Sequence, residues 1–174
     1  MHVLDNYIKS IKDFPKEGIV FRDITTVTQN PEGLKMSIDE LAKSIEELNP
    51  DVIVGIEARG FIFGAPVAYK LNKAFVPVRK PGKLPRATIS QDYELEYGFA
   101  TIEMHTDSIK KGQKVVIIDD LLATGGTVRA ACSLVEQLGG EVLGFSFLVE
   151  LKGLNGRENL KGYKVESIVA YDGK

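Results

Sequence analysis

The chain has little that would build a covalently linked, metal-bound or membrane-embedded structure. Among its 174 residues are one cysteine, Cys132, and two isolated histidines, His2 and His105. A single cysteine excludes an internal disulfide and suits a reducing compartment. The histidines lack metal-ligand spacing, so we expect both at the surface. No apolar run approaches the roughly 18 residues of a membrane span, and the first residues carry no signal-peptide pattern. These absences predict a cytoplasmic protein without a membrane partner.

A strong charge of one sign is missing as well. The formal net charge is −2, with 44% hydrophobic and 26% charged residues, which is ordinary for a globular protein. The whole molecule therefore attracts anions weakly, and any anion site must come from local clustering. No concentrated basic helix suggests a nucleic-acid partner. The length suits one domain over residues 1–174, and no repeat or linker divides it.

The most informative stretch is residues 115–127. Its first four residues, Val-Val-Ile-Ile, show no alternation, which favours a strand buried on both faces of a parallel sheet. Asp119 and Asp120 follow, where we expect that strand to end, and a Thr-Gly-Gly-Thr turn then opens a helix reaching about Leu138. Ligands of open α/β sheets bind at the carboxyl ends of the strands. This stretch therefore predicts a ligand site.

The turn suits a phosphate and the acids suit a sugar. Glycine lets the backbone approach a ligand closely, and free amides at the start of a helix favour an anion. The two carboxylates repel a phosphate, but they accept hydrogen bonds from sugar hydroxyls or orient waters around a divalent cation. Together they predict a ribose 5-phosphate site. The candidate phosphate ligands are Ala123, Thr124, Gly125, Gly126 and Thr127.

Other interpretations of this stretch fit less well. A P-loop needs Gly-Lys-Ser/Thr after its glycines, and no lysine follows Gly126. A dinucleotide fingerprint, Gly-x-Gly-x-x-Gly directly after the strand, is absent too. A buried strand, turn and helix without any ligand remains the alternative, but two adjacent acids before the turn are unusual for it.

The rest of the chain predicts alternating strands and helices, and hence a parallel sheet flanked by helices. We expect an amphipathic helix over about residues 2–12, a short strand at 19–21, and a helix that begins after Asn30-Pro31. Residues 152–161 are expected to be an exposed loop or short helix. The other expected elements are strands at 52–56, 74–79, 141–150 and about 165–171, and a helix at about 60–71.

A second strand-to-helix turn and a group of cations point to a second anion. Residues 57–60, Glu-Ala-Arg-Gly, can face an anion with their amides, although a turn arginine is often merely solvated. Arg79, Lys80, Lys83 and Arg86 follow with no acid before Gln91, which suits a leaving group of several negative charges. The polar segment 81–98, rich in glycine and proline, is either a lid or a solvated hairpin.

Residues 119–127 resemble the phosphoribosyl pyrophosphate signature of the type I phosphoribosyltransferases. Further blocks match in the same order at residues 14–24, 57–61, 79–85 and 95–98, and the resemblance is to the members that act on adenine. It implies the type I phosphoribosyltransferase fold, an α/β fold with a central, mostly parallel sheet flanked by helices. It also implies a small N-terminal hood, roughly residues 1–30, and a flexible loop, roughly residues 80–98.

The activity implied by the resemblance is a pentosyl transfer of purine salvage. The 5-phosphoribosyl group of phosphoribosyl pyrophosphate passes to adenine, giving AMP and pyrophosphate. The resemblance also implies that Mg²⁺ is held mainly by the substrate's pyrophosphate, the ribose hydroxyls and water, with no protein metal ligand, and that the protein is a homodimer. Two alternatives stay open: a transferase for another base such as xanthine, and a non-catalytic regulator. A regulator of this kind would need a DNA-binding domain, and the residues before Phe14 are too few for a helix-turn-helix domain.

The resemblance also assigns roles to single residues. Transferases of 6-oxopurines carry an aspartate where this chain has Ala123, so the resemblance gives the purine's proton to Glu96; an ordinary loop carboxylate is the alternative. The implied catalytic residues are Glu96 and Arg59, the ribose ligands Asp119 and Asp120, the pyrophosphate ligands Ala58, Arg59, Arg79, Lys80 and Lys83, and the adenine-binding residues Val20, Phe21, Arg22 and Leu121.

Overall fold

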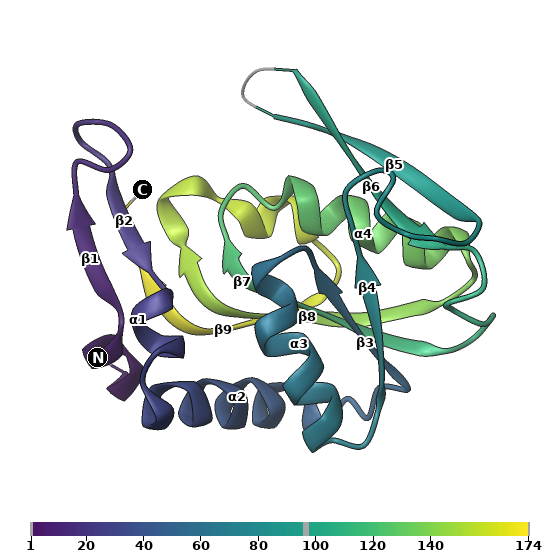
Figure 1. The fold of residues 1–174 in the computed structure, drawn as a ribbon, viewed down its shortest axis with the longest axis horizontal. Helices are drawn as coiled ribbons and strands as arrows, with labels where there is room; N and C mark the ends of the chain where they lie inside the picture. Colours follow the sequence, from purple (N-terminus) through teal and green to yellow (C-terminus); the bar gives the residue numbers. More distant parts are fainter. Residues whose placement is uncertain (1, 96–97, 174) are drawn as a thin grey trace.

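A five-stranded parallel sheet forms the centre of the protein in a computed structural model that describes residues 2–95 and 98–173 (Figure 1). The strand order is β4-β3-β7-β8-β9. Helices α2 and α3 cover one face and α4 the other, so the predicted α/β class is confirmed. The elements are β3 (Val52–Ile56), β4 (Ala74–Val78), β7 (Lys114–Leu122), β8 (Glu141–Leu151), β9 (Lys164–Tyr171), α2 (Pro31–Glu46), α3 (Arg59–Lys70) and α4 (Gly126–Gln137).

Strand β7 lies in the middle of the sheet and is buried on both faces. Val115 and Ile117 pack in the core on the α4 side, whereas Val116 and Ile118 pack on the side of α2 and α3. This explains a run of apolar residues without alternation. The prediction that the strand ends before Asp119 is wrong, because pairing with β8 continues to Leu122. The acids thus lie within the last residues of the strand.

The N-terminal segment departs from the predicted helix over residues 2–12. A short 3₁₀-helix, η1 (Val3–Tyr7), is followed by β1 (Lys9–Lys12), which pairs antiparallel with β2 (Val20–Asp23) before helix α1 (Thr25–Thr28). Pairing with β2 satisfies backbone groups that the helix would otherwise have used. Leu4 is fully buried, so the apolar spacing reflects docking onto α2 rather than a long helix.

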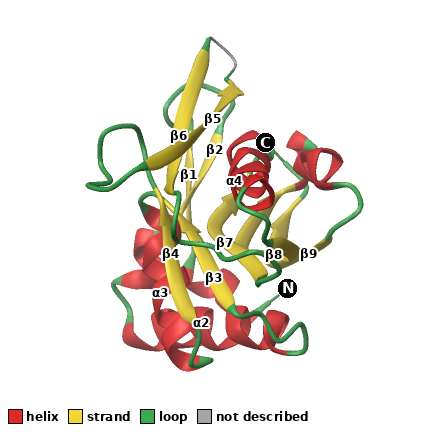
Figure 2. Cartoon of the chain, turned by 90° about the vertical axis from the view of Figure 1, so that its right-hand side faces the viewer, coloured by secondary structure: helices red, strands yellow, loops and turns green. Residues whose placement is uncertain are grey.

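A second hairpin projects beyond the central sheet and is seen at the top of Figure 2. It pairs β5 (Thr88–Glu94) with β6 (Phe99–His105) as a separate two-stranded sheet. The sequence left a lid and a solvated hairpin as alternatives for residues 81–98. From β5 onward, the described part of this segment belongs to the hairpin. Whether the hairpin closes as a lid stays a prediction. His105 is only 7% exposed, so the prediction of a surface histidine is wrong at this position. Its strand packs into the core through Ile102 and Met104.

Residues 152–161 form two 3₁₀-helices, η2 (Lys152–Leu154) and η3 (Gly156–Leu160). The expectation of an exposed segment is wrong in part, because Gly156 is buried and Leu160 is 1% exposed. Within residues 2–95 and 98–173, no helix is long and apolar enough to cross a membrane.

Candidate active site

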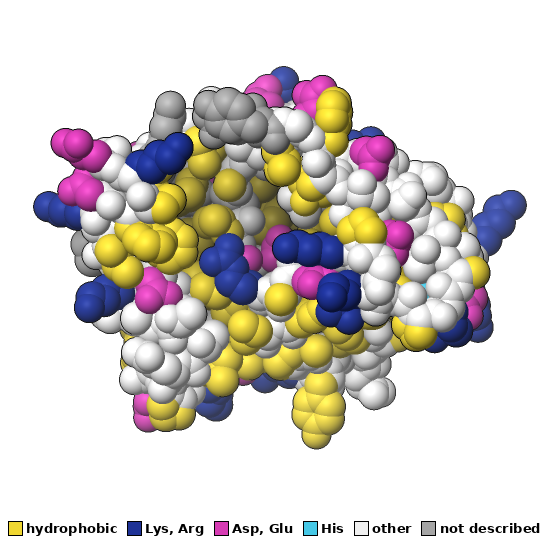
Figure 3. All heavy atoms as spheres, turned by 45° about the horizontal axis from the view of Figure 1, so that its top comes forward, with side chains coloured by type: hydrophobic (Ala, Val, Ile, Leu, Met, Phe, Trp, Pro, Cys, Tyr) yellow, Lys and Arg dark blue, Asp and Glu magenta, His cyan; other side chains and the backbone are white. Residues whose placement is uncertain are grey.

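One continuous hollow opens where the carboxyl ends of β3 and β7 meet the two hairpins. Its smaller part, about 250 Å³, is lined by the acids and the glycine turn. The larger part, about 1010 Å³, reaches from β2 to β5. Both parts share Arg59, Tyr93, Asp120 and Leu121. Figure 3 shows the hollowed face, with hydrophobic side chains on its walls and charged side chains of both signs near its edge.

All five predicted phosphate ligands, residues 123–127, line the smaller part. Gly125 precedes the first residue of α4 with φ +83°, a conformation that strains any other residue. A Cβ there would also lie 2.6 Å from the carbonyl oxygen of Gly156. A Cβ at Gly126 would meet no atom closer than 3.6 Å. The turn thus presents the start of a helix to the hollow, as an anion requires.

The two acids differ in their surroundings. Asp120 is 4% exposed, and its Oδ2 lies 3.0 Å from Arg59 Nε without a hydrogen bond from any described residue. The backbone N–H of Asp120 donates to Asp119 Oδ1 at 2.9 Å. Burial, and next the charge of Asp120, raise the pKa of Asp119 well above its ordinary value. The acids therefore offer acceptor oxygens to a ligand at a site where negative charge is costly.

The second turn reaches the hollow through Glu57 and Arg59, which both line it; Ala58 lies between them without lining it. The peptide bond between Glu57 and Ala58 is cis. Helix α3 approaches β7 closely, since a Cβ on Gly60 would lie 2.8 Å from Asp119 Oδ1. This close approach brings Arg59 beside Asp120.

Of the four predicted cations, Arg79 and Arg86 have side chains that are paired with acids. Arg79, Lys80 and Lys83 do not line the hollow. Arg79 Nε lies 3.2 Å from Glu57 Oε2, and the backbone N–H of Lys80 donates to the same oxygen at 2.8 Å. The Lys80 N–H, and then Arg79, lower the pKa of Glu57. Arg86 pairs with Asp107 at 3.0 Å. Sequence reasoning missed these partners because they lie 21–23 positions away.

The hood residues predicted to face a base do line the larger part, as does Leu121. The guanidinium of Arg22 lies 3.9 Å above the Tyr171 ring and donates to Ser10. Ile19 and Leu154 add apolar surface. Apolar walls with a few polar groups are typical of a pocket for a flat ring. The hood residues in question are Val20, Phe21 and Arg22.

The hollow also contains residues that the sequence analysis did not select. Tyr93 and Arg129 line it, and Asn159 Nδ2 donates to the carbonyl of Thr124 at 2.7 Å. Tyr93 stands in the segment suspected of being a lid, whereas Asn159 carries no sequence signal. Glu96 lies outside the described residues; the preceding Leu95 lines the hollow. The catalytic role of Glu96 stays a prediction.

A glycine turn at a helix start, two acids on the last residues of a parallel strand and an apolar cleft define a phosphosugar-binding α/β protein. Residues 23–173 match the phosphoribosyl transferase domain family. The match spans most of the chain, so the protein belongs to the phosphoribosyltransferase family, and the resemblance noted from the sequence is confirmed.

Close relatives carry a more specific name. The adenine phosphoribosyltransferase of Lachnoclostridium phytofermentans is 63% identical over 174 residues and covers 100% of both chains. The crystal structure of adenine phosphoribosyltransferase from Thermoanaerobacter pseudethanolicus has TM-score 0.93 and 52% identity, covering 97% of this chain and 98% of that one. The Saccharomyces cerevisiae enzyme, complexed with an imino-altritol bisphosphate and adenine, has TM-score 0.88 and 40% identity, covering 95% and 96%.

Proposed function

We propose that this protein transfers the 5-phosphoribosyl group from phosphoribosyl pyrophosphate to adenine, giving AMP and pyrophosphate in purine salvage. The observation that carries the proposal is one hollow that joins the glycine turn, Asp119 and Asp120, Arg59 and the apolar cleft behind β2. The names of the relatives support adenine as the base.

Each part of the hollow then has a task. The amides of residues 124–127 hold the 5′-phosphate, and Asp119 and Asp120 accept hydrogen bonds from the ribose hydroxyls. The bond from the anomeric carbon to pyrophosphate breaks and a bond to the purine nitrogen forms, through a state with positive charge on the sugar. Fixing sugar and base in line lowers the barrier by orientation.

Arg59 faces the departing pyrophosphate in this proposal and neutralises part of its charge. Ala58 contributes through the backbone of the same turn. Arg79, Lys80 and Lys83 lie outside the hollow, so we propose that they attract the pyrophosphate from nearby rather than hold it within this chain.

The carboxylates of Asp119 and Asp120 suit an Mg²⁺ ion that is bound mainly by the substrate and by water. Within the described residues, no group of three or more potential ligand side chains is poised to hold a metal ion. The buried Asp120 Oδ2 accepts no hydrogen bond from the part of the chain that the structure describes, so it could accept one from a water of the metal. When bound, Mg²⁺ neutralises charge on the pyrophosphate leaving group. Asp119 and Asp120 orient its waters.

The proton of the purine is assigned to Glu96. General acid–base help is worth about 10²–10⁴ in rate, so we expect Glu96→Gln to lower turnover by at least about tenfold while AMP binding changes little. Steady-state rates and an AMP titration measure the two effects. Unchanged turnover would remove Glu96 from the mechanism.

We also propose a homodimer, as the resemblance implies. The chain mass is 19.1 kDa, so light scattering of a dimer should report twice that value. A mass of one chain at micromolar concentration contradicts this part of the proposal without affecting the reaction.

The decisive experiment compares four bases in parallel. The protein is incubated with phosphoribosyl pyrophosphate, Mg²⁺ and either adenine, hypoxanthine, guanine or xanthine, and pyrophosphate release is followed. We expect release with adenine and much less with the other bases. Preference for an oxopurine would replace adenine as the substrate, and binding without release for any base would favour the non-catalytic regulator.

A further inference from the structure

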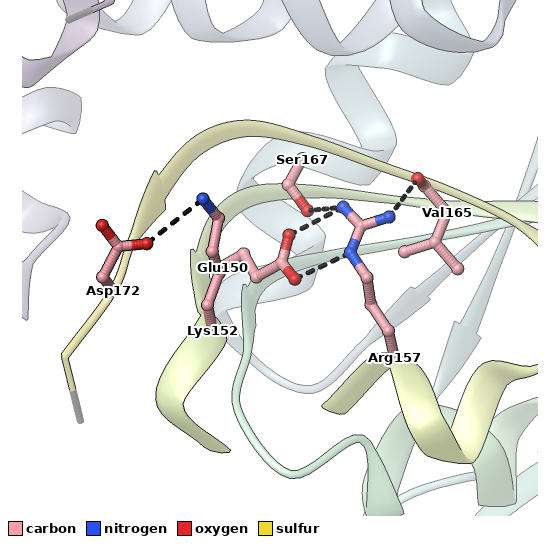
Figure 4. A network of polar contacts seen from close by, with 6 residues as sticks. All are labelled: Glu150, Lys152, Arg157, Val165, Ser167 and Asp172. Carbon is pink, nitrogen blue, oxygen red and sulfur yellow. Dashed lines mark hydrogen bonds and ion pairs between the residues drawn. The ribbon is translucent and has the colours of Figure 1, made fainter. Parts of the chain in front are cut away.

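An ion pair between a buried glutamate and a half-exposed arginine lies next to the hollow without lining it. Figure 4 shows the pair and its neighbours. Glu150 of β8 is 4% exposed. Arg157 of η3 donates from Nε to Glu150 Oε1 and from Nη2 to Oε2, both at 2.7 Å. Its Nη1 also donates to the carbonyl of Val165 at 2.9 Å, and Nη2 approaches Ser167 Oγ at 3.3 Å. One side chain thus fastens η3 to strands β8 and β9.

The 3₁₀-helix that Arg157 fastens is packed against the outer side of the glycine turn. A Cβ on Gly156 would lie 2.3 Å from the carbonyl oxygen of Ala123, so the two backbones are in direct contact. The Gly156 carbonyl in turn lies against Gly125, and Asn159 Nδ2 donates to the carbonyl of Thr124 at 2.7 Å. Three consecutive residues of the turn therefore touch η3.

We propose that Arg157 is a positioning residue for the 5′-phosphate turn. Its two-pronged bond to Glu150 fixes η3, and η3 fixes the carbonyls of Ala123 and Thr124, so that the following amides face the phosphate. The inference rests on the proposed function, which makes this turn the phosphate site. Arg157 touches no reacting atom and acts only through the turn.

The chemistry of the pair favours orientation over stability as its main effect. A pair of one buried and one half-exposed partner contributes little net stability on average, because desolvation of Glu150 and solvent screening at Arg157 offset the attraction. A guanidinium that bonds both oxygens of one carboxylate fixes direction as well as distance, and a lysine cannot reproduce that fork. The hydrogen bonds from Arg157 lower the pKa of Glu150, so they favour the ionised carboxylate that the arginine binds.

The test compares Arg157→Met and Arg157→Lys with a matched control on the same segment. Lys161→Met removes an exposed ion pair to Glu158, which spans 2.5 Å. Calorimetric titration with AMP gives Kd, and steady-state rates give KM for each substrate. Misplacing binding groups by about 1 Å costs up to about 10²-fold. We expect Arg157→Met to raise the Kd of AMP and the KM of phosphoribosyl pyrophosphate about tenfold or more, and Arg157→Lys about threefold.

The remaining readouts separate positioning from folding. The KM of adenine should rise less than that of phosphoribosyl pyrophosphate in the Arg157 variants, because the hood residues of the larger part, Val20 to Arg22, belong to β2 and not to the turn. Lys161→Met should match wild type, because the ion pair to Glu158 that it removes is exposed. A permanently inactive fraction changes neither Kd nor KM, whereas reversible unfolding raises an apparent Kd by the reciprocal of the folded fraction. Thermal melts must therefore show each variant more than about 90% folded at the assay temperature, which limits that contribution to about 1.1-fold. Amides of residues 123–127 should also exchange hydrogen faster in Arg157→Met.

Each contrary result has a distinct meaning. If wild type itself binds neither AMP nor phosphoribosyl pyrophosphate, the proposed function fails. If wild type binds both and the folded Arg157 variants bind equally well, the positioning role is overturned. Should Arg157→Met not fold, Arg157→Lys decides by the same criterion, and an unchanged Kd overturns the role.

Discussion

The two strand-to-helix turns lie side by side, after the paired strands β3 and β7, yet they are built differently. The turn after β7, residues 123–127, lines the hollow with every residue and has η3 packed behind it. The turn after β3 lines it only through Glu57 and Arg59. Glycine and hydroxyl residues encode the first turn locally, whereas the second depends on partners far along the chain.

The acids beside the two turns differ in the same way. Backbone and arginine donors lower the pKa of Glu57, so that acid is already satisfied and serves the fold. Burial and a neighbouring charge raise the pKa of Asp119, so that acid is held at a cost to stability. A titratable group in a cleft whose pKa is raised in this way is typical of a functional site.

The largest expected effect is at the contact between the turn after β3 and the last part of strand β7. Gly60→Ala places a Cβ 2.8 Å from Asp119 Oδ1 and 3.1 Å from the carbonyl of Ile118, so both α3 and Asp119 must shift. We expect kcat/KM for phosphoribosyl pyrophosphate to fall about 100-fold, as misplacement of about 1 Å can cost that much. Gly173→Ala, whose Cβ meets nothing within 4 Å, is the control. Near-normal kinetics for Gly60→Ala would show that the position of Asp119 does not depend on its close contact with α3.

A second substitution tests whether the glycines of residues 123–127 determine the shape of that turn. Gly125→Ala forces a positive φ on alanine and a Cβ to 2.6 Å from the Gly156 carbonyl. The strain alone costs about 1–2 kcal/mol, so Tm should fall by about 2–8 °C. We expect kcat/KM to fall about 30-fold, as the clash displaces the amides beside it. Gly126→Ala should leave Tm unchanged, because its Cβ has room; equal melting of both variants would contradict the difference.

The third substitution, Asp119→Asn, separates the effect of this carboxylate on activity from its effect on stability. Because the pKa of Asp119 is raised in the folded state, the folded protein holds that proton to higher pH than the unfolded chain. Stability therefore falls as pH rises from the ordinary value, 3.8, through the raised pKa, and stays reduced above it. Asp119→Asn lacks this loss, so its Tm at pH 8 should exceed that of wild type by about 2–5 °C while kcat/KM falls about tenfold.

Thermal melts between pH 4 and 8 check the sign of this effect. The gap between variant and wild type should widen with rising pH and close near the ordinary value. Curves that stay parallel throughout that range would show that Asp119 is not destabilised by its charge.

The sequence predicted what short stretches specify. The strand of Val115 to Ile118, the acids and the glycine turn follow from local pattern, because burial on both faces and helix-start amides are local properties. The cap at Asn30 was likewise visible, and its Oδ1 accepts from the amides of Glu32 and Gly33 at 3.0 Å.

The missed features depend on distant partners. Strand β1 was predicted as helix because its pairing with β2 leaves no trace in its own pattern. Arg79 was predicted to be a free cation, because its partner Glu57 lies 22 positions earlier in the chain. Asn159 reaches the carbonyl of Thr124 across 35 positions, and no motif announces a side chain that bonds a backbone oxygen.

The smallest expected effect decides how the exposed lysines of the segment after β4 act. The side chain of Lys83 lies outside the hollow, while its carbonyl accepts from Arg79 Nη1 at 3.3 Å. If the ammonium group only attracts pyrophosphate through solvent, Lys83→Met should raise the inhibition constant of pyrophosphate about two- to fourfold at low salt. That difference should vanish near 0.5 M salt, where charges more than about 4–5 Å apart are screened. Arg59→Met, which removes a lining cation, should weaken inhibition more and keep its effect in salt. A loss of about tenfold or more for Lys83→Met that persists in salt would instead make Lys83 a direct ligand, as the family resemblance implies, and would require the segment around it to reach a pyrophosphate site that the described hollow does not include.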